Sequence, residues 1–77
     1  MKKYLIVFEK TETGYSAYSP DVVGCVAAGK TRRQAEKNMH EALMMHIKGL
    51  LEDNLPLPAA AASSEYVLLN EKTLVTA

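Results

Sequence analysis

The chain of 77 residues has one cysteine, one phenylalanine and no tryptophan. A single cysteine excludes an internal disulfide and a zinc site built on paired cysteines. This composition is typical of a reducing compartment, so we expect a cytoplasmic protein. Long hydrophobic runs are also missing. No segment approaches the roughly 18 apolar residues of a membrane-spanning helix, so we expect no membrane association.

The sequence also lacks an excess of either charge. Nine basic and nine acidic residues give a formal net charge of zero. Proteins that coat nucleic acid without sequence preference use a broad positive field to attract phosphate groups. A chain without that field is a poor candidate for a histone-like or RNA-coating role.

A chain of this length predicts one domain, over residues 1–77, with a small core. Such domains bury only about 60% of the surface of the unfolded chain, and association often supplies the missing stability. In the first predicted strand, Tyr4, Ile6 and Phe8 share one face while Leu5 and Val7 share the other. Because both faces are apolar, we expect a second subunit to cover one of them. The sequence therefore predicts a homodimer or a higher even oligomer.

Turn residues divide the chain into a β-β-β-α-β order. Gly14 is expected to take a positive φ in a hairpin loop, Pro20 to close the second strand, and Gly24 to form a tight turn. The four alanines after Pro58 could add one helical turn to an otherwise extended connector. We predict strands at about 2–10, 14–19, 25–28 and 65–70, a helix at about 32–53, a connector at 54–64, and a tail at 71–77 that either continues the strand or frays. This is an α+β fold: a small antiparallel sheet with one long helix packed on one face.

The predicted helix has clear signals at both ends. Thr31 and Gln34 form a capping box, in which each side chain accepts from the other residue's backbone amide. Asn54 occupies the position of a left-handed C′ residue, and Pro56 prevents continuation. One face of the helix is expected to pack on the sheet; its residues are Ala35, Met39, Ala42, Leu43, His46 and Leu50.

The candidates for catalysis are weak. Glu36 and Glu41 diverge by about 140° on the helix and cannot converge on one metal ion. His46, on the apolar face, is more typical of a core or interface histidine than of a catalytic base, and Cys25 is more typical of a buried thiol than of a nucleophile. His40 lies on the polar side. We therefore expect no enzymatic activity, no bound metal and no cofactor.

Two groups of residues are candidates for partner binding. Lys30, Arg32 and Arg33 crowd the start of the helix, where cations oppose the helix dipole. Such a cluster is either a solvated face or a surface for phosphate or an acidic partner. Tyr15 and Tyr18 lie on opposite faces of the second strand, so an exposed one would be an interface anchor.

The ordered series of turn and helix signals resembles the N-terminal domain of the HicB family of antitoxins, from about Tyr4 to Tyr66. The family's Gly-Tyr-x-Ala hairpin return is followed by a Pro-Asp-hydrophobic-Pro-Gly-Cys turn, a Gly-x-Thr helix start, an Ala-x-x-Asn-x-x-Glu-Ala helix and a Pro-x-Pro end. In this sequence the matching residues are Gly14-Tyr15-Ser16-Ala17, Pro20-Asp21-Val22-Val23-Gly24-Cys25, Gly29-Lys30-Thr31, Ala35 with Asn38, Glu41 and Ala42, and Pro56-Leu57-Pro58. Val23 stands where the family usually has a second proline, and we expect no DNA-binding domain after Ala77.

The resemblance implies a prokaryotic antitoxin with a truncated ribonuclease-H-like fold. It implies that the chain binds a HicA-like toxin and occludes its mRNA-cleaving site, with contacts expected from Tyr18, Pro20, Asp21, Lys30, Arg32 and Arg33. Many family members bind DNA through an additional domain. Because we expect this chain to lack that domain, we do not expect direct DNA binding. Two alternatives stay open: a stand-alone homo-oligomeric regulatory or ligand-binding module, and a small metal-dependent ribonuclease-H-like nuclease.

Overall fold

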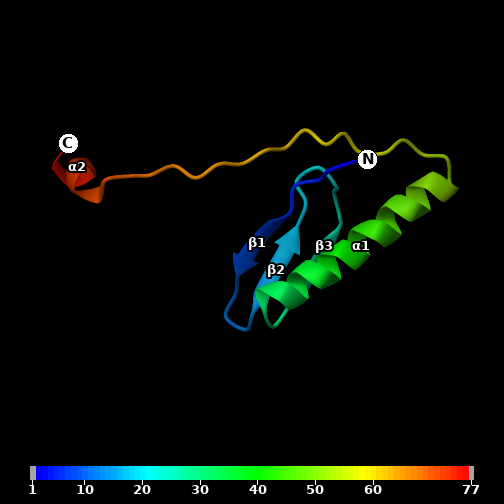
Figure 1. Cartoon of the computed structure of the whole chain (residues 1–77), viewed down its shortest axis with the longest axis horizontal. Helices are drawn as coiled ribbons and strands as arrows, with labels where there is room; N and C mark the ends of the chain where they lie inside the picture. The colour runs from blue at the N-terminus through cyan, green and yellow to red at the C-terminus, as the bar shows by residue number, and fades with distance from the viewer. Residues whose placement is uncertain (1, 77) are drawn as a thin grey trace.

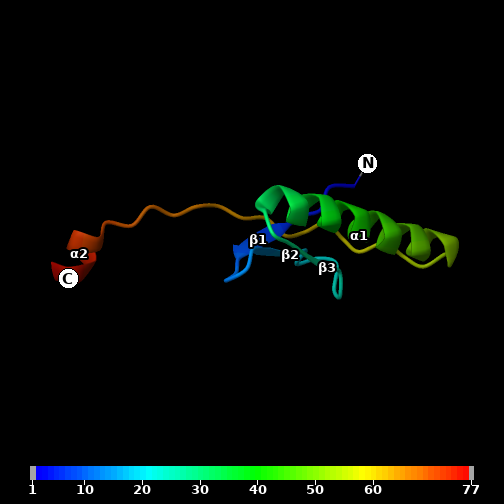
Figure 2. The same cartoon turned by 90° about the horizontal axis from the view of Figure 1, so that it is seen from below.

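Three strands form one antiparallel sheet, and a long helix covers part of one face (Figures 1 and 2). The computed structural model describes residues 2–76, with side chains as far as residue 74. Its elements are β1 (Val7–Lys10), β2 (Tyr15–Tyr18), β3 (Val26–Gly29), α1 (Arg32–Glu52) and α2 (Glu71–Thr76). The strand order is β1-β2-β3, so β1 and β3 are the edges. The predicted α+β class, with an antiparallel sheet and one long helix, is confirmed.

The hairpin between β1 and β2 places Val7 opposite Tyr18 and Lys10 opposite Tyr15. Within its loop, the Thr11 amide donates to the Gly14 carbonyl at 2.8 Å, and the Gly14 amide donates to the Thr11 hydroxyl at 3.1 Å. The prediction of a positive φ at Gly14 is wrong, because the positive-φ glycine of the described residues is Gly24.

Space, not backbone conformation, requires a glycine at position 14. A Cβ at Gly14 would lie 2.8 Å from the Cα of Lys30, against the backbone that follows β3. The return strand therefore passes the end of β3 at a distance that no side chain would permit.

Two consecutive turns connect β2 to β3. The Val22 amide donates to the Ser19 carbonyl, and the Cys25 amide donates to the Val22 carbonyl, each at 3.2 Å. Gly24 has a φ of 83°, which confirms the predicted tight turn. The turn returns Val22 and Cys25 to the core, where both are buried.

Helix α1 begins at the predicted cap. The Gln34 amide donates to the Thr31 hydroxyl at 3.1 Å. The reciprocal half of the capping box does not form, because the Gln34 side chain instead donates to Asn38 at 3.0 Å. Asn38 in turn donates to the Ala28 carbonyl at 2.7 Å and joins the helix to β3.

The other end of α1 is a Schellman motif. Asn54 has a φ of 55°, its amide donates to the Leu51 carbonyl, and the Leu55 amide donates to the Leu50 carbonyl at 2.9 Å. These bonds satisfy carbonyl groups that the helix end would otherwise leave unpaired. The predicted left-handed position of Asn54 is confirmed.

The core is small and lies between α1 and the sheet. Helix α1 packs against β3 and β2. The backbone of Gly29 approaches the first turn of α1 so closely that a Cβ there would lie 2.8 Å from the carbonyl carbon of Gln34. The buried apolar residues are Ala17, Val22, Cys25, Ala35 and Met39.

The second half of α1 extends beyond the sheet (Figures 1 and 2). The whole of α1, with 21 residues, spans about 31 Å, whereas a strand of four residues spans about 13 Å. His46 lies on this overhang and is exposed, so its predicted position in the packed face is wrong for the single chain. The sheet is too short to reach it.

The predicted fourth strand does not form within residues 2–76. Residues 65–70 are extended, but they pair with none of the three strands and run away from the sheet (Figure 1). Their short continuous apolar run, Tyr66 to Leu69, is consistent with a strand but does not specify a partner edge. The connector is extended and forms no extra helical turn.

The tail is neither a strand nor frayed over the residues described. It forms α2, in which the Asn70 side chain accepts from the amides of Lys72 at 3.0 Å and Thr73 at 3.4 Å. An asparagine before Glu71 is a helix-start signal that the strand prediction overlooked. The last residue of the predicted tail, Ala77, lies outside the described residues.

Candidate functional site

The turn between β2 and β3 presents the first group of predicted contact residues. Tyr18 is the last residue of β2 and is 37% exposed. Pro20 is exposed, and Asp21 is half-buried. The two turn bonds and the positive φ of Gly24 hold this surface in one conformation. A preorganised surface loses less entropy when it binds a partner.

Asp21 also fixes the connector. Its Oδ2 accepts from the amide of Ala61 at 3.0 Å and from the amide of Ala62 at 2.8 Å. A second bond anchors the same segment, because the Tyr4 hydroxyl donates to the Pro58 carbonyl at 2.7 Å. These partners are about forty or more positions apart, so no local sequence pattern could identify them. The carboxylate assigned to partner contact therefore holds the chain's own connector.

Replacing Asp21 with alanine is expected to release the connector locally. The change removes the acceptor of both amides, and we expect hydrogen exchange at Ala61 and Ala62 to accelerate by about tenfold, since a hydrogen bond to a charged group is worth about 1.5 kcal/mol. Tyr4→Phe is the control, because it removes the neighbouring anchor at Pro58 without touching either amide. Equal exchange rates in Asp21→Ala and the parent chain would show that the two bonds do not hold the connector in solution.

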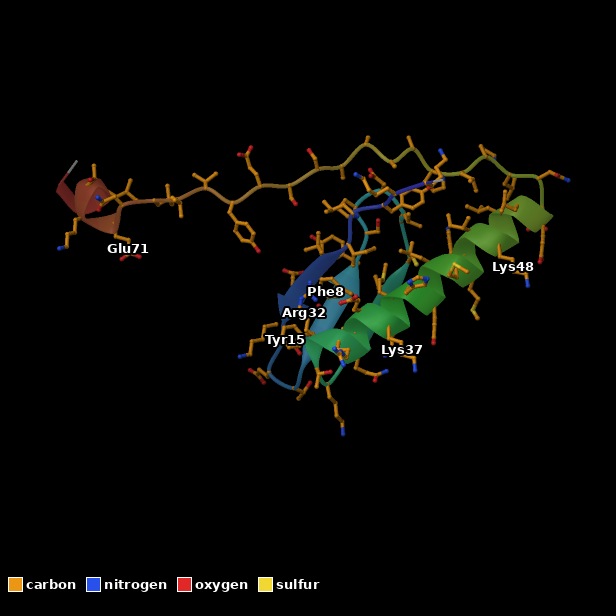
Figure 3. All side chains as sticks on the ribbon, in the orientation of Figure 1. Phe8, Tyr15, Arg32, Lys37, Lys48 and Glu71 are labelled. Atoms are coloured by element: carbon orange, nitrogen blue, oxygen red, sulfur yellow. The ribbon has the colours of Figure 1, made fainter. Side chains whose placement is uncertain are left out.

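The second group of predicted residues lies at the start of α1. Arg32 packs over the Phe8 ring, with its guanidinium carbon 4.2 Å from the ring centroid, and forms a 3.1 Å ion pair with Glu36. Figure 3 shows Arg32 reaching back toward Phe8 on β1. Lys30 and Arg33 are exposed. Arg32 therefore joins α1 to β1 while its side chain remains exposed, as do those of Lys30 and Arg33.

The six predicted contact residues form two groups, not one site. Tyr18, Pro20 and Asp21 lie at the end of the sheet where β3 begins, and Lys30 follows the end of β3. β3 separates the groups by about 13 Å. A partner that touches both must lie along the sheet or the helix.

An open groove of about 1220 Å³ lies between β1 and the flank of α1. Tyr4, Ile6 and Phe8, which share one face of the predicted first strand, line it, whereas Leu5 and Val7 of the other face do not, and the groove itself was not predicted. Its charged rim includes Lys2, Glu36, Glu41 and Lys48. Its apolar lining is Tyr4, Ile6, Phe8, Met39, Leu43, Met44, Met45, Ile47 and Leu51.

The residues weighed for catalysis do not converge. Burial raises the pKa of the Cys25 thiol above its ordinary value, which lowers the thiolate fraction at neutral pH. Both histidines are exposed on α1. Within the part of the chain that the structure describes, no three His, Cys, Asp or Glu side chains are close enough to hold a metal ion.

Among the helices between residues 2 and 76, none combines the length and the apolar character that a bilayer crossing requires.

Comparison with known proteins identifies relatives over most of the chain. The family model described as HicB_like antitoxin of bacterial toxin-antitoxin system matches residues 4–73. A 14.9 kDa protein in the rep-hol intergenic region of Haemophilus phage HP1 is 42% identical over 64 residues, which cover 83% of this chain and 48% of that protein. The chain thus spans about half the length of this relative.

Two further relatives match a larger share of their own length. A UPF0150 protein of Helicobacter pylori is 41% identical over 49 residues, which cover 64% of this chain and 68% of that protein. A chain of the solved HicA3 and HicB3 toxin-antitoxin complex has 38% sequence identity and a TM-score of 0.65, over 78% of this chain and 70% of that chain.

Proposed function

Because the chain belongs to the HicB-like antitoxin family, we propose that it binds a HicA-type mRNA-cleaving toxin and neutralises it by covering the toxin's active site. The observation that carries this proposal is the family match over residues 4–73. The similarity to a chain of a toxin-antitoxin complex, at 38% identity, supports a toxin as the partner.

Covering an active site requires an exposed, rigid surface. The β2–β3 turn supplies one, with Tyr18 as an aromatic anchor and Pro20 beside it. We assign direct contact to these two residues and rim contacts to Lys30 and Arg33. Asp21 already binds the connector within its own chain, so its role is to maintain the shape of this surface.

Arg32 has a similar positioning role at the other end of β3. Its guanidinium lies between the Phe8 ring and the Glu36 carboxylate, so its charge is partly satisfied within the chain. We assign the partner contacts of this group to Lys30 and Arg33, because Arg32, although also exposed, already has these two contacts within the chain.

We further propose that the antitoxin acts in the cytoplasm, where the toxin's mRNA substrate lies, and that it associates with itself. The small core and the exposed apolar groove support self-association. The ribonuclease-H-like arrangement implied by the resemblance requires an additional strand in the sheet and remains a prediction.

A second candidate function is a homo-oligomeric ligand-binding or regulatory module that works without a toxin. The groove of about 1220 Å³ favours it, because its size and apolar lining suit a small molecule. Gene neighbourhood separates the two proposals: an adjacent reading frame for a short basic protein containing a histidine favours the antitoxin.

Replacing Tyr18 with alanine is expected to weaken toxin binding by roughly thirtyfold or more, since an aromatic anchor contributes about 2 kcal/mol. Calorimetry would measure binding of the purified chain to the toxin encoded by the adjacent reading frame. Growth of cells that co-express the two proteins would report neutralisation. Tyr18→Phe should retain most of the affinity, because it keeps the ring.

His46→Ala is the matched control, because it truncates an exposed ring on the overhang of α1, away from the turn. Thermal melting of each variant verifies that it is folded. If the parent chain neither binds this toxin nor restores growth, the antitoxin proposal fails. If Tyr18→Ala binds as tightly as the parent, the contact surface is elsewhere.

A further inference from the structure

The outer edge of β1 is open and apolar. β1 is an edge strand, so one side of its backbone pairs with β2 and the other faces solvent. Ile6 and Phe8, on the side of the sheet that faces α1, line the groove together with Met39 and Leu43. An additional strand beside β1 would pair the free backbone groups and place side chains into this groove.

The same chain carries a segment suited to that position. Residues 65–70 are extended, and their apolar side chains face solvent. Tyr66 is 99% exposed and Leu68 is 97% exposed. Val67 and Leu69, on the alternate face, are also exposed. Exposed apolar residues in a continuous row mark an interaction site.

The anchored connector directs this segment away from its own sheet. The bonds to Pro58, Ala61 and Ala62 fix the chain across the end of the sheet, and the following residues continue outward without a turn (Figures 1 and 2). Pairing with its own β1 would require a bend toward the sheet after Ala62 (Figure 1). The edge of a second molecule requires none.

We propose that residues 65–70 of one molecule add as a fourth strand to the free edge of β1 in a second molecule, and that the exchange is reciprocal. Each copy then donates one strand and accepts one, which closes a twofold dimer. Residues 63–70 extend about 26 Å beyond the last anchored amide, and residues 65–70 of this length are the donated strand itself.

The chemistry of β1 limits where the strand can add. Glu9 and Lys10 are exposed at the hairpin end, and charges there disfavour pairing with an apolar segment. Val7 and Phe8 of β1, with Leu5 and Ile6 just before it, form the apolar part, near Tyr4, whose hydroxyl donates to Pro58 of the connector. The donated strand therefore aligns with this part. Because successive side chains of a strand point to opposite faces, one of two pairs fills the groove: Tyr66 with Leu68, or Val67 with Leu69.

Light scattering on the purified chain, without toxin, tests the exchange. The parent chain is expected at twice 8.5 kDa at micromolar concentration. Leu68→Pro is expected at 8.5 kDa, because proline cannot donate a backbone bond within an added strand. Glu71→Pro is the matched control and should stay dimeric, because it lies at the first position of α2, where proline is tolerated.

Hydrogen exchange separates the remaining outcomes. In the dimer, amides of residues 66–69 should exchange at least about tenfold more slowly than in Leu68→Pro. A monomeric parent chain overturns the proposal, whether these amides are protected by its own β1 or unprotected. A dimer that persists in Leu68→Pro also overturns it, because another surface must then hold the subunits. Neither outcome depends on toxin neutralisation, which is measured separately by growth.

Discussion

Replacing Met39 with aspartate is expected to unfold the protein. Met39 is 1% exposed and is one of the two largest fully buried side chains. A carboxylate at this position would be buried without a partner, at a cost of about 3–5 kcal/mol. That cost is comparable to the whole stability of a small domain, which is about 4–10 kcal/mol for this length. The loss should appear as the absence of a cooperative transition in circular dichroism or urea titration.

Met45→Asp provides the matched control for this experiment. Met45 lies in the same helix and is 74% exposed in the single chain, so in the monomeric Leu68→Pro background, where no partner strand covers the groove, the same substitution leaves its charge in water. We expect a change of less than about 1 kcal/mol in the free energy of unfolding. A cooperative transition in Met39→Asp at the parent midpoint would contradict the packing of α1 on the sheet.

Opposite stability changes are expected when alanine replaces Gly29 and Gly49. A Cβ at Gly29 would lie 2.8 Å from the Gln34 carbonyl carbon, so the start of α1 must move away from β3. We expect a loss of about 2 kcal/mol, as for other overpacked sites. A Cβ at Gly49 meets no atom within 4 Å, and alanine in a helix interior is favoured by about 0.5–1 kcal/mol.

Urea denaturation would measure the free energy of unfolding of both variants, each of which replaces glycine with alanine. Because the added atom is the same, the difference of about 3 kcal/mol reports the local environment. A destabilised Gly49→Ala would indicate that the overhang of α1 contacts another surface in solution. An unchanged Gly29→Ala would indicate that β3 and α1 are farther apart than in the structure.

The close approach at Gly29 also explains how the small core is assembled. Ala35 is completely buried, and Gly29 allows the first turn of α1 to lie directly on β3. Arg32 adds its contact with Phe8, and Asn38 its bond to Ala28. Attachment is therefore concentrated in the first half of the helix. The second half is left with an exposed apolar surface that includes Met44, Met45 and Leu51.

Local chemistry determined the features that the sequence predicted well. The Thr31 cap, the left-handed Asn54 and the turn at Gly24 each depend on atoms within a few positions. A hydroxyl accepts from an amide three residues later, and an asparagine or a glycine tolerates a positive φ. These relations hold wherever the segment lies, so the order of strands, turns and helix was readable without knowledge of the packing.

Tertiary structure alone decided which distant segments of the chain lie next to each other. The requirement for Gly14 arises from the backbone after Gly29, and the role of Asp21 arises from two connector amides far along the chain. His46 is exposed because the sheet beneath the helix is short. Residues 65–70 contain the short apolar run of a strand, but such a run favours only an extended backbone. Strand pairing also needs a free edge within reach, and the anchored connector directs these residues away from the edge of their own sheet.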